Sequence, residues 1–296
     1  MSVPVAYFGV ILIWSTTPLA IKWSGEDVGF LFGVTARICI ALALGLILIM
    51  WLRNKHRLTR EALPVYLASG ITIYGTFIFV YWGAQYVSSG LISVLFGLTP
   101  FFTAVIAHIW LKEHNLSPSK ISGMLLGALG LLAIFKDQVI LDSSLNVAIA
   151  GILVAVAWQA FGTVWFKAAK TAEVSALSTT VGGISVATPL FVLTWLFFDR
   201  QVPTHIELHT LSSIVYLGVI GSIFGMVMFY YALKKIDAAK ISLITLITPV
   251  IALLLGALVN DEEVSENIVL GTALILSGLL LFQWTSLRHL FTGYKQ

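Results

Sequence analysis

The sequence is poor in charge, and this scarcity limits the class of protein more than any motif does. Aspartate, glutamate, lysine and arginine together make up 10% of the 296 residues, whereas hydrophobic residues make up 58%. Soluble domains carry charge on about 25% of their residues, and a soluble chain could not hide this much apolar surface from water. The composition therefore excludes a soluble globular protein and predicts a chain that lies in a lipid bilayer.

Cysteine and catalytic patterns are also scarce. Cys39 is the single cysteine, so the chain can form no internal disulfide. The sequence has no glycine-rich phosphate loop, no pair of carboxylates in the middle of an apolar segment, and no cluster of histidines or cysteines. We therefore predict no enzyme activity, no metal and no cofactor. The net charge of +3 is explained by membrane topology, so we expect no nucleic-acid partner.

What the sequence does contain is a series of long apolar segments. About 20 residues are needed for a helix to cross the ~30 Å hydrocarbon core of a bilayer. The first segment has no basic lead and is too long for a signal-peptide core, so we expect it to be retained as a membrane span. The ten predicted spans cover roughly residues 4–23, 29–52, 62–83, 90–111, 121–136, 147–167, 175–198, 210–233, 239–259 and 268–287.

One pattern of residues occurs twice, at a fixed offset of 149. Ten spans divide into five per copy, and an odd number of crossings forces the second copy to enter the membrane from the opposite side. We predict an all-α integral membrane protein of ten transmembrane helices in two inverted five-helix repeats, residues 1–137 and 146–287, with a cytoplasmic tail at 288–296. Such repeats are typical of transporters. The recurring residues are Tyr81, Ile92, Ser93, Thr99, Pro100 and Glu113, matched by Tyr230, Ile241, Ser242, Thr248, Pro249 and Glu262.

Lysines and arginines in the short loops indicate the orientation, because these residues favour the cytoplasmic side. With the N-terminus inside, thirteen of them lie in cytoplasmic segments and three on the opposite side, while Arg37 lies within the second span. We therefore predict that both termini are cytoplasmic. Glycines on the fifth and tenth spans, such as Gly123 and Gly271, allow close helix contacts. They predict packing between the halves or a dimer face, and hence a monomer or a weak homodimer.

Two prolines lie at equivalent depth in the two repeats. Pro100 and Pro249 each remove one backbone hydrogen bond and free the carbonyl four residues earlier, at Phe96 and Thr245. A transmembrane helix can tolerate such a kink without any functional role. We favour a functional role as helix hinges, because symmetric bend points suit alternating access between two inverted halves.

Aromatic and neutral polar residues near the middle of the spans predict a central chamber. Trp14 and Trp158 lie at equivalent depth in the first helix of each half, and tryptophan at that depth needs a partner or a cavity. Packing in the helix core is the alternative for each ring. The predicted substrate-binding residues are Trp14, Thr17, Tyr74, Phe77, Tyr81, Ser93, Phe96, Trp158, Gln159, Tyr230, Ser242 and Thr245.

Ionisable groups are almost absent from the middle of the spans. For Arg37 we favour a structural role, in which it bonds helix-end carbonyls, over contact with substrate. A phosphorylated substrate is disfavoured, because no lysine or arginine lies at the midplane to hold it. Proton coupling through His108, Glu113 or Glu262 is an open alternative, but for the two glutamates we favour local capping or pairing.

Several stretches resemble the EamA branch of the drug/metabolite transporter superfamily. They are Ile-Trp-Ser-Thr-Thr-Pro around Trp14, the arginine of the second span, the stretch from Gly90 to Pro100, and the spacing of Glu113 and Gly123. The resemblance extends from about residue 5 to 286. It implies ten helices in two inverted repeats, with a cavity lined by helices one, three, four, six, eight and nine. Some aromatic amino-acid exporters of this group carry cavity tryptophans on helices one and six, where Trp14 and Trp158 lie.

Together these features predict a secondary transporter of a bacterial inner membrane. We expect it to export small neutral or zwitterionic metabolites by alternating access, apolar or aromatic amino acids being the expected substrates. The alternative is a broad-specificity efflux carrier for toxic amphiphilic compounds, which the lack of a mid-membrane carboxylate to pair with a cation disfavours. A membrane enzyme or a non-transporting sensor would need a catalytic cluster or a soluble domain, and neither is visible.

Overall fold

The computed structural model describes residues 2–52, 58–112, 116–138, 143–169, 174–235 and 244–292, and these contain helices and no strand. Eight helices are long and apolar enough to cross a membrane, and two shorter apolar helices complete the predicted ten. The all-α membrane fold is therefore confirmed. The first five spans are α1 (Val3–Trp23), α2 (Phe30–Trp51), α3 (Leu63–Gly83, after the short η1, Arg60–Ala62), α4 (Ser89–Phe96) continued by α5 (Thr99–Trp110), and α6 (Pro118–Gln138).

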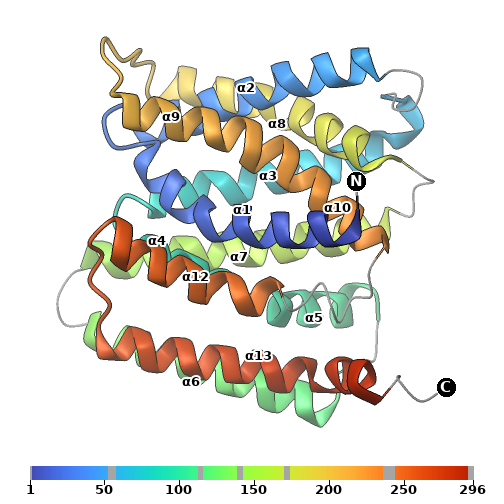
Figure 1. Ribbon diagram of the computed structural model, residues 1–296, viewed down its shortest axis with the longest axis vertical. Helices are drawn as coiled ribbons and strands as arrows, with labels where there is room; N and C mark the ends of the chain where they lie inside the picture. Colours follow the sequence, from blue (N-terminus) through green and yellow to red (C-terminus); the bar gives the residue numbers. More distant parts are fainter. Residues whose placement is uncertain are drawn as a thin grey trace.

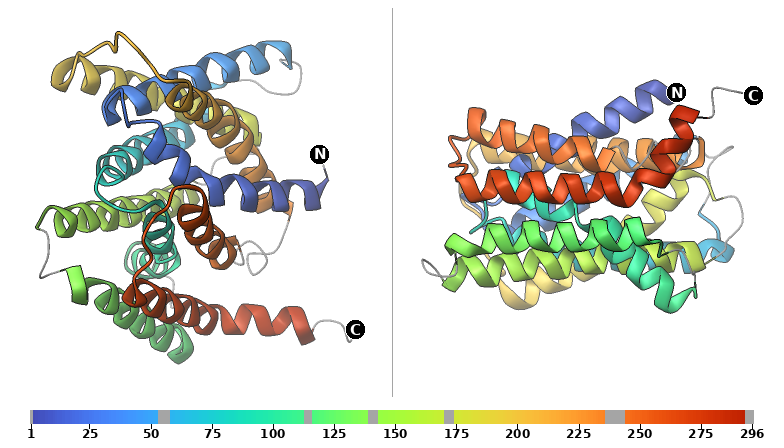
Figure 2. Two further views of the ribbon diagram at one scale, coloured as in Figure 1. Left: turned by 60° about the vertical axis from the view of Figure 1, so that its left-hand side comes forward. Right: turned by 90° about the horizontal axis from the view of Figure 1, so that it is seen from below.

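The second five spans follow the same order. They are α7 (Ser143–Ala168), α8 (Ala176–Phe198), α9 (Leu208–Tyr216) continued by η2 (Leu217–Phe224) and α10 (Gly225–Lys235), α12 (Ile244–Val259), and α13 (Glu266–Thr292). The start of α1 and the end of α13 lie at one end of the bundle, as ten crossings require (Figures 1 and 2). We call this the terminal end, and the opposite end, which holds the α12–α13 connection, the Glu262 end.

The packing of α6 against α13 shows that the two halves are inverted. These helices are the fifth of each half and lie side by side at one edge of the bundle (Figure 1). A Cβ added to Gly123 would lie 2.5 Å from the carbonyl oxygen of Gly278, and one added to Gly130 would lie 2.6 Å from that of Gly271. The helices therefore run antiparallel, and the predicted glycine packing between the halves is confirmed.

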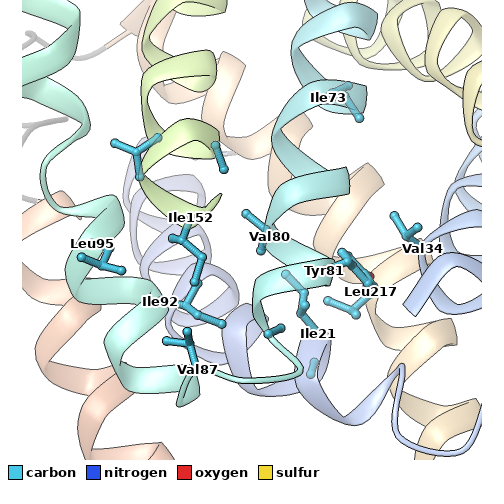
Figure 3. Close-up of a cluster of buried hydrophobic side chains, with 14 of the residues drawn as sticks. Ile21, Val34, Ile73, Val80, Tyr81, Val87, Ile92, Leu95, Ile152 and Leu217 are labelled. Atoms are coloured by element: carbon cyan, nitrogen blue, oxygen red, sulfur yellow. The ribbon is translucent and has the colours of Figure 1, made fainter. Parts of the chain in front are cut away.

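The remaining contacts build a central group of helices from both halves. The third span α3 packs against α7 and α8, α1 packs against α10 and α12, and α4 packs against α12. Buried apolar side chains fill the space between them, including Ile21, Tyr81, Ile92, Ile152 and Leu217 (Figure 3). Since Ile152 and Leu217 belong to the second half, one core joins both repeats.

The fourth span is broken beside Pro100. Helix α4 ends at Phe96 and α5 begins at Thr99, with Pro100 in its first turn. The carbonyl oxygen of Phe96, which the proline leaves without its usual partner, accepts a hydrogen bond from the Thr99 hydroxyl at 2.6 Å. Beyond the break the chain leaves α12 and packs mainly against α7. Pro249, by contrast, lies inside a continuous α12.

Candidate functional site

A chain of aromatic rings links α1, α10 and α7. The ring centroid of Trp14 lies 4.7 Å from that of Phe229, which lies 5.7 Å from that of Tyr230. The Tyr230 ring in turn stacks on Phe166 of α7 at 5.6 Å. The structure thus brings together two predicted site residues, Trp14 and Tyr230. Phe166 was not predicted, because nothing in the sequence near the end of its helix distinguishes it from lipid-facing phenylalanines.

A second cluster surrounds Arg37, which is 2% exposed. Its guanidinium carbon lies 4.4 Å from the ring centroid of Phe77 and 5.9 Å from that of Tyr81. The Nε atom donates to the Ser222 hydroxyl at 3.0 Å, and Nη1 donates to the Tyr81 hydroxyl at 3.3 Å. The hypothesis that Arg37 bonds helix-end carbonyls is wrong, because its side chain reaches inward to hydroxyl groups. This cluster contains two predicted site residues, Phe77 and Tyr81.

One face of α1 connects the two clusters. Trp14, Thr17 and Ile21 recur at spacings of three and four residues, so they share a face of the helix. Trp14 belongs to the first cluster, and Ile21 packs in the core beside Tyr81 (Figure 3). Thr17 lies between them and is half-buried, with its hydroxyl donating to the Ile13 carbonyl at 2.6 Å.

Two further predicted residues have defined side-chain partners, and a third is buried. The Thr76 hydroxyl donates to Gln159 Oε1 at 3.1 Å, so Gln159 of α7 faces α3 inside the bundle. The Tyr74 hydroxyl shares a hydrogen bond of 2.7 Å with that of Thr194, and its ring packs against Phe191, which places Tyr74 between α3 and α8. Ser93 is buried in α4.

Trp158 lies apart from Trp14. Its indole N–H donates to the carbonyl of Ile71 at 3.0 Å, and its ring covers the backbone at Gly75. The side chain is 36% exposed and continues an exposed stripe of α7 that includes Val154 and Phe161. Trp158 and the neighbouring Gln159 therefore both contact α3, at different turns of that helix. The structure does not bring the two tryptophans together.

Glu262 is the acceptor of a network that we call the Glu262 clamp. Its carboxylate accepts hydrogen bonds from the Ser89 N–H at 3.0 Å, the Ser89 hydroxyl at 2.9 Å and the Gly90 N–H at 3.3 Å. Asn260 donates to it at 3.0 Å, and Lys22 Nζ lies 3.4 Å from it. The clamp caps the N-terminus of α4 and ties α1, α4 and the α12–α13 connection together.

The clamp also decides the charge of Glu262. Burial by itself raises the pKa of this carboxyl, but the hydrogen bonds from Ser89, the charge of Lys22 and the hydrogen bond from Gly90 outweigh burial and lower the pKa below 4.5. The group is therefore ionised at neutral pH, which favours the capping role over proton transfer in this conformation.

For two other predicted residues the structure gives the position along the helix. His108 lies in the last turn of α5, and Thr245 lies in the first turn of α12. Glu113 and Ser242 lie outside the described residues. Within the described ranges, no three histidine, cysteine, aspartate or glutamate side chains gather as a metal site would require.

Two inverted five-helix units, a broken helix and paired aromatic clusters between the units define the class of inverted-repeat membrane transporters. The chain belongs to the EamA-like transporter family, whose profile matches residues 2–136 and again residues 146–284.

Named relatives agree with this class. The chain is 29% identical over 297 residues to the uncharacterized transporter YoaV of Bacillus subtilis, covering 98% of this chain and 99% of that protein. It is 24% identical over 232 residues to a probable amino-acid metabolite efflux pump of Escherichia coli, covering 74% of this chain and 76% of the pump. One solved crystal structure matches with a TM-score of 0.69 over 97% of this chain and 99% of the other, at 20% identity, and this likeness concerns the fold alone.

Proposed function

We propose that this transporter exports apolar or aromatic amino acids by alternating access. The observation that carries the proposal is the pair of aromatic clusters, around Trp14 on α1 and around Phe77 on α3, each with a neutral hydroxyl group close by, those of Thr17 and Ser222 respectively. Rings suit an apolar side chain, and hydroxyls suit the polar end of a zwitterion. The similarity to a probable amino-acid metabolite efflux pump supports this substrate class.

The proposed cycle uses the broken fourth span. The Glu262 clamp holds α4 against α1 and α12 at one end of the bundle, while α5 packs against α7 beyond the break. By the distribution of lysine and arginine, the terminal end faces the cytoplasm and the Glu262 end faces outward. Export then requires the clamp to open while the span bends at Pro100. By analogy with the bacterial relatives, we place the protein in a bacterial inner membrane.

Counterflow in liposomes tests the function. The purified protein is reconstituted in vesicles loaded with one unlabelled amino acid, and uptake of the labelled amino acid is followed across a panel. We expect stimulated exchange for phenylalanine, tryptophan, tyrosine or leucine. No stimulated exchange for any amino acid would remove this assignment. Resistance of expressing cells to cationic dyes, without amino-acid exchange, would favour the broad efflux carrier instead.

We expect Pro100→Ala to slow transport more than it affects stability. Alanine restores a backbone N–H that can bond the Phe96 carbonyl, so the continuous helix competes with the observed break. The exchange rate should fall about 10-fold, while the melting temperature stays the same or rises. Pro249→Ala serves as the comparison, and we expect it to slow exchange less because α12 is already continuous. Equal effects of both variants would contradict a hinge at Pro100.

We expect Trp14→Ala to weaken substrate binding. An aromatic contact of this kind contributes about 0.5–1.5 kcal/mol beyond its buried area, so the KM for an aromatic amino acid should rise about 3- to 10-fold. The matched control is Trp284→Ala, because Trp284 is 59% exposed on α13, away from α1. A KM that is unchanged in Trp14→Ala, or equally raised in the control, would remove Trp14 from the site.

A further inference from the structure

The Arg37 guanidinium is a buried positive charge that makes no ion pair within the described part of the chain. Among the described residues no carboxylate pairs with it, and its hydrogen bonds go to two neutral hydroxyls, those of Ser222 and Tyr81. A guanidinium has five N–H donors, and the two hydrogen bonds use Nε and Nη1 and leave Nη2 without a hydrogen bond to the described residues. Burying a charge is costly unless an opposite charge or several hydrogen bonds compensate for it.

A methyl-sized space lies beside this group at Gly221. A methyl group added to Gly221 would meet Arg37 Nη2 at 3.4 Å, Leu217 at 3.5 Å and Thr17 Oγ1 at 4.0 Å, all ordinary contact distances. One helical turn earlier, a methyl added to Gly218 would lie 2.9 Å from Ile40 and 3.0 Å from the Arg37 carbonyl oxygen, which are close contacts. The helix is therefore tightly packed at Gly218, whereas Gly221 leaves space for a methyl group.

The local backbone is unusual at the same place. Residues Leu217–Phe224 form η2, a π-helical segment within an otherwise α-helical span. Such segments are rare and occur mostly at functional sites. Gly221 and Ser222 both lie in η2, so the wide turn places a glycine and a hydroxyl beside the guanidinium.

We propose that Arg37 binds the carboxylate of the transported substrate, in the space bounded by Gly221 and Thr17, while the rings of Phe77 and Tyr81 contact its apolar part. The proposal rests on the proposed amino-acid function and assigns the acidic end of the substrate to one residue. The guanidinium presents paired N–H groups that match a carboxylate in a bidentate arrangement. One guanidinium neutralises the single negative charge of a carboxylate, whereas a doubly charged phosphate would need a second cationic side chain.

The face of α1 that carries Trp14 and Thr17 provides the route of the substrate to Arg37. Arg37 itself is 2% exposed, whereas Trp14 and Thr17 are half-buried on the same face of α1. A substrate that passes Trp14 therefore reaches Arg37 along this face, with Thr17 between the two clusters.

Binding of a carboxylate and of its neutral isostere tests the proposal without relying on transport. Full-length protein in nanodiscs is titrated with 3-phenylpropionate and with 3-phenylpropanamide, and binding is followed by the shift in melting temperature. We expect the carboxylate to bind about 10- to 100-fold more tightly than the amide. Arg37→Met should abolish that difference, and Arg37→Lys should keep part of it because it retains the charge.

Gly221→Ala keeps Arg37 and fills the space beside it. We expect this variant to weaken carboxylate binding while its melting temperature without ligand stays close to that of the wild type. The matched control is Gly25→Ala, where an added methyl also meets nothing closer than 3.4 Å but lies in the α1–α2 connection. The control should bind the carboxylate as the wild type does, and Gly221→Ala remains informative if Arg37→Met does not fold.

The two proposals fail in different ways. Equal binding of carboxylate and amide by the wild type, binding of neither, or a preference that survives Arg37→Met would overturn the role of Arg37. The counterflow panel decides the amino-acid function separately. Arg37-dependent binding of the carboxylate without exchange of any amino acid would keep the anion site and remove the amino-acid substrate.

Discussion

Glu262→Ala should lower the unfolding free energy by about 2–4 kcal/mol. The substitution leaves the N–H groups of Ser89 and Gly90 without their acceptor and Lys22 without its counter-charge. Loss of a helix N-cap costs about 0.5–2 kcal/mol, and removing one partner of a buried charged network costs more. The Glu262 side chain is 5% exposed, so water cannot replace these bonds without opening the clamp. The melting temperature of the purified protein measures the effect.

The neighbouring Glu263 provides the control. Glu263 is exposed, so Glu263→Ala should leave the melting temperature nearly unchanged. The transport rate should also differ between the two variants, because only Glu262→Ala releases α4 at the Glu262 end. If both variants unfold at the same temperature, the clamp does not stabilise the fold.

The same carboxylate predicts a pH dependence of stability. Because hydrogen bonds and Lys22 outweigh burial and lower the pKa of Glu262 from 4.5, its contribution to stability is complete above that value. The contribution is lost as the pH falls through the lowered pKa, where the carboxyl gains a proton. The wild type should therefore lose its stability advantage over Glu262→Gln as the pH falls below about 4.5. An advantage that is constant down to pH 3 would contradict this assignment.

Gly130→Val should disrupt the pairing of α6 with α13. A Cβ at this position would lie 2.6 Å from the carbonyl oxygen of Gly271 and 3.0 Å from the backbone nitrogen of Ile275, so the two helices must separate. Overpacking typically costs about 1–3 kcal/mol, and a branched side chain against backbone should reach the upper part of that range. Gly271→Val should act alike, because the added Cβ would lie 2.6 Å from the Gly130 oxygen.

The control for this pair lies one residue away. Leu129 is 55% exposed on α6, so Leu129→Val introduces a β-branched side chain on an exposed face of the same helix. We expect the melting temperature to fall in Gly130→Val and Gly271→Val and to change little in Leu129→Val. A similar fall in all three variants would show that a β-branched residue lowers helix stability by itself and that the contact between α6 and α13 does not matter.

Part of the site could be predicted because the sequence repeat shows which residues of the two halves are equivalent. The recurrence of Pro100 as Pro249 led to the expectation of breaks at matching depth, and the structure breaks the fourth span beside Pro100. For Pro249 the expected break is absent, since α12 continues through it. The sequence marks where a backbone hydrogen bond is missing, whereas the neighbouring helices decide whether the helix breaks there.

The role of Arg37 shows what the sequence left open. Its position within an apolar span marked it as unusual, and that was the available signal. The direction of its side chain depends on how α2 is rotated against α3 and η2, and no local pattern encodes that rotation. The same holds for Trp158, which turns toward Ile71 and Gly75.

The sequence by itself determined the membrane location, the ten spans and the inverted repeat. The membrane location and the spans follow from the length of the apolar segments and from loop charge, which are local properties of the chain. The inversion follows from counting, because each copy of the repeat has an odd number of spans. Only the tertiary structure decided which side chains meet. In a soluble protein a polar face would show the rotation of each helix. Here lipid-facing and protein-facing surfaces are both apolar, so the rotation is set by close packing between helices, at contacts such as Gly123 against Gly278 and Gly75 against Trp158.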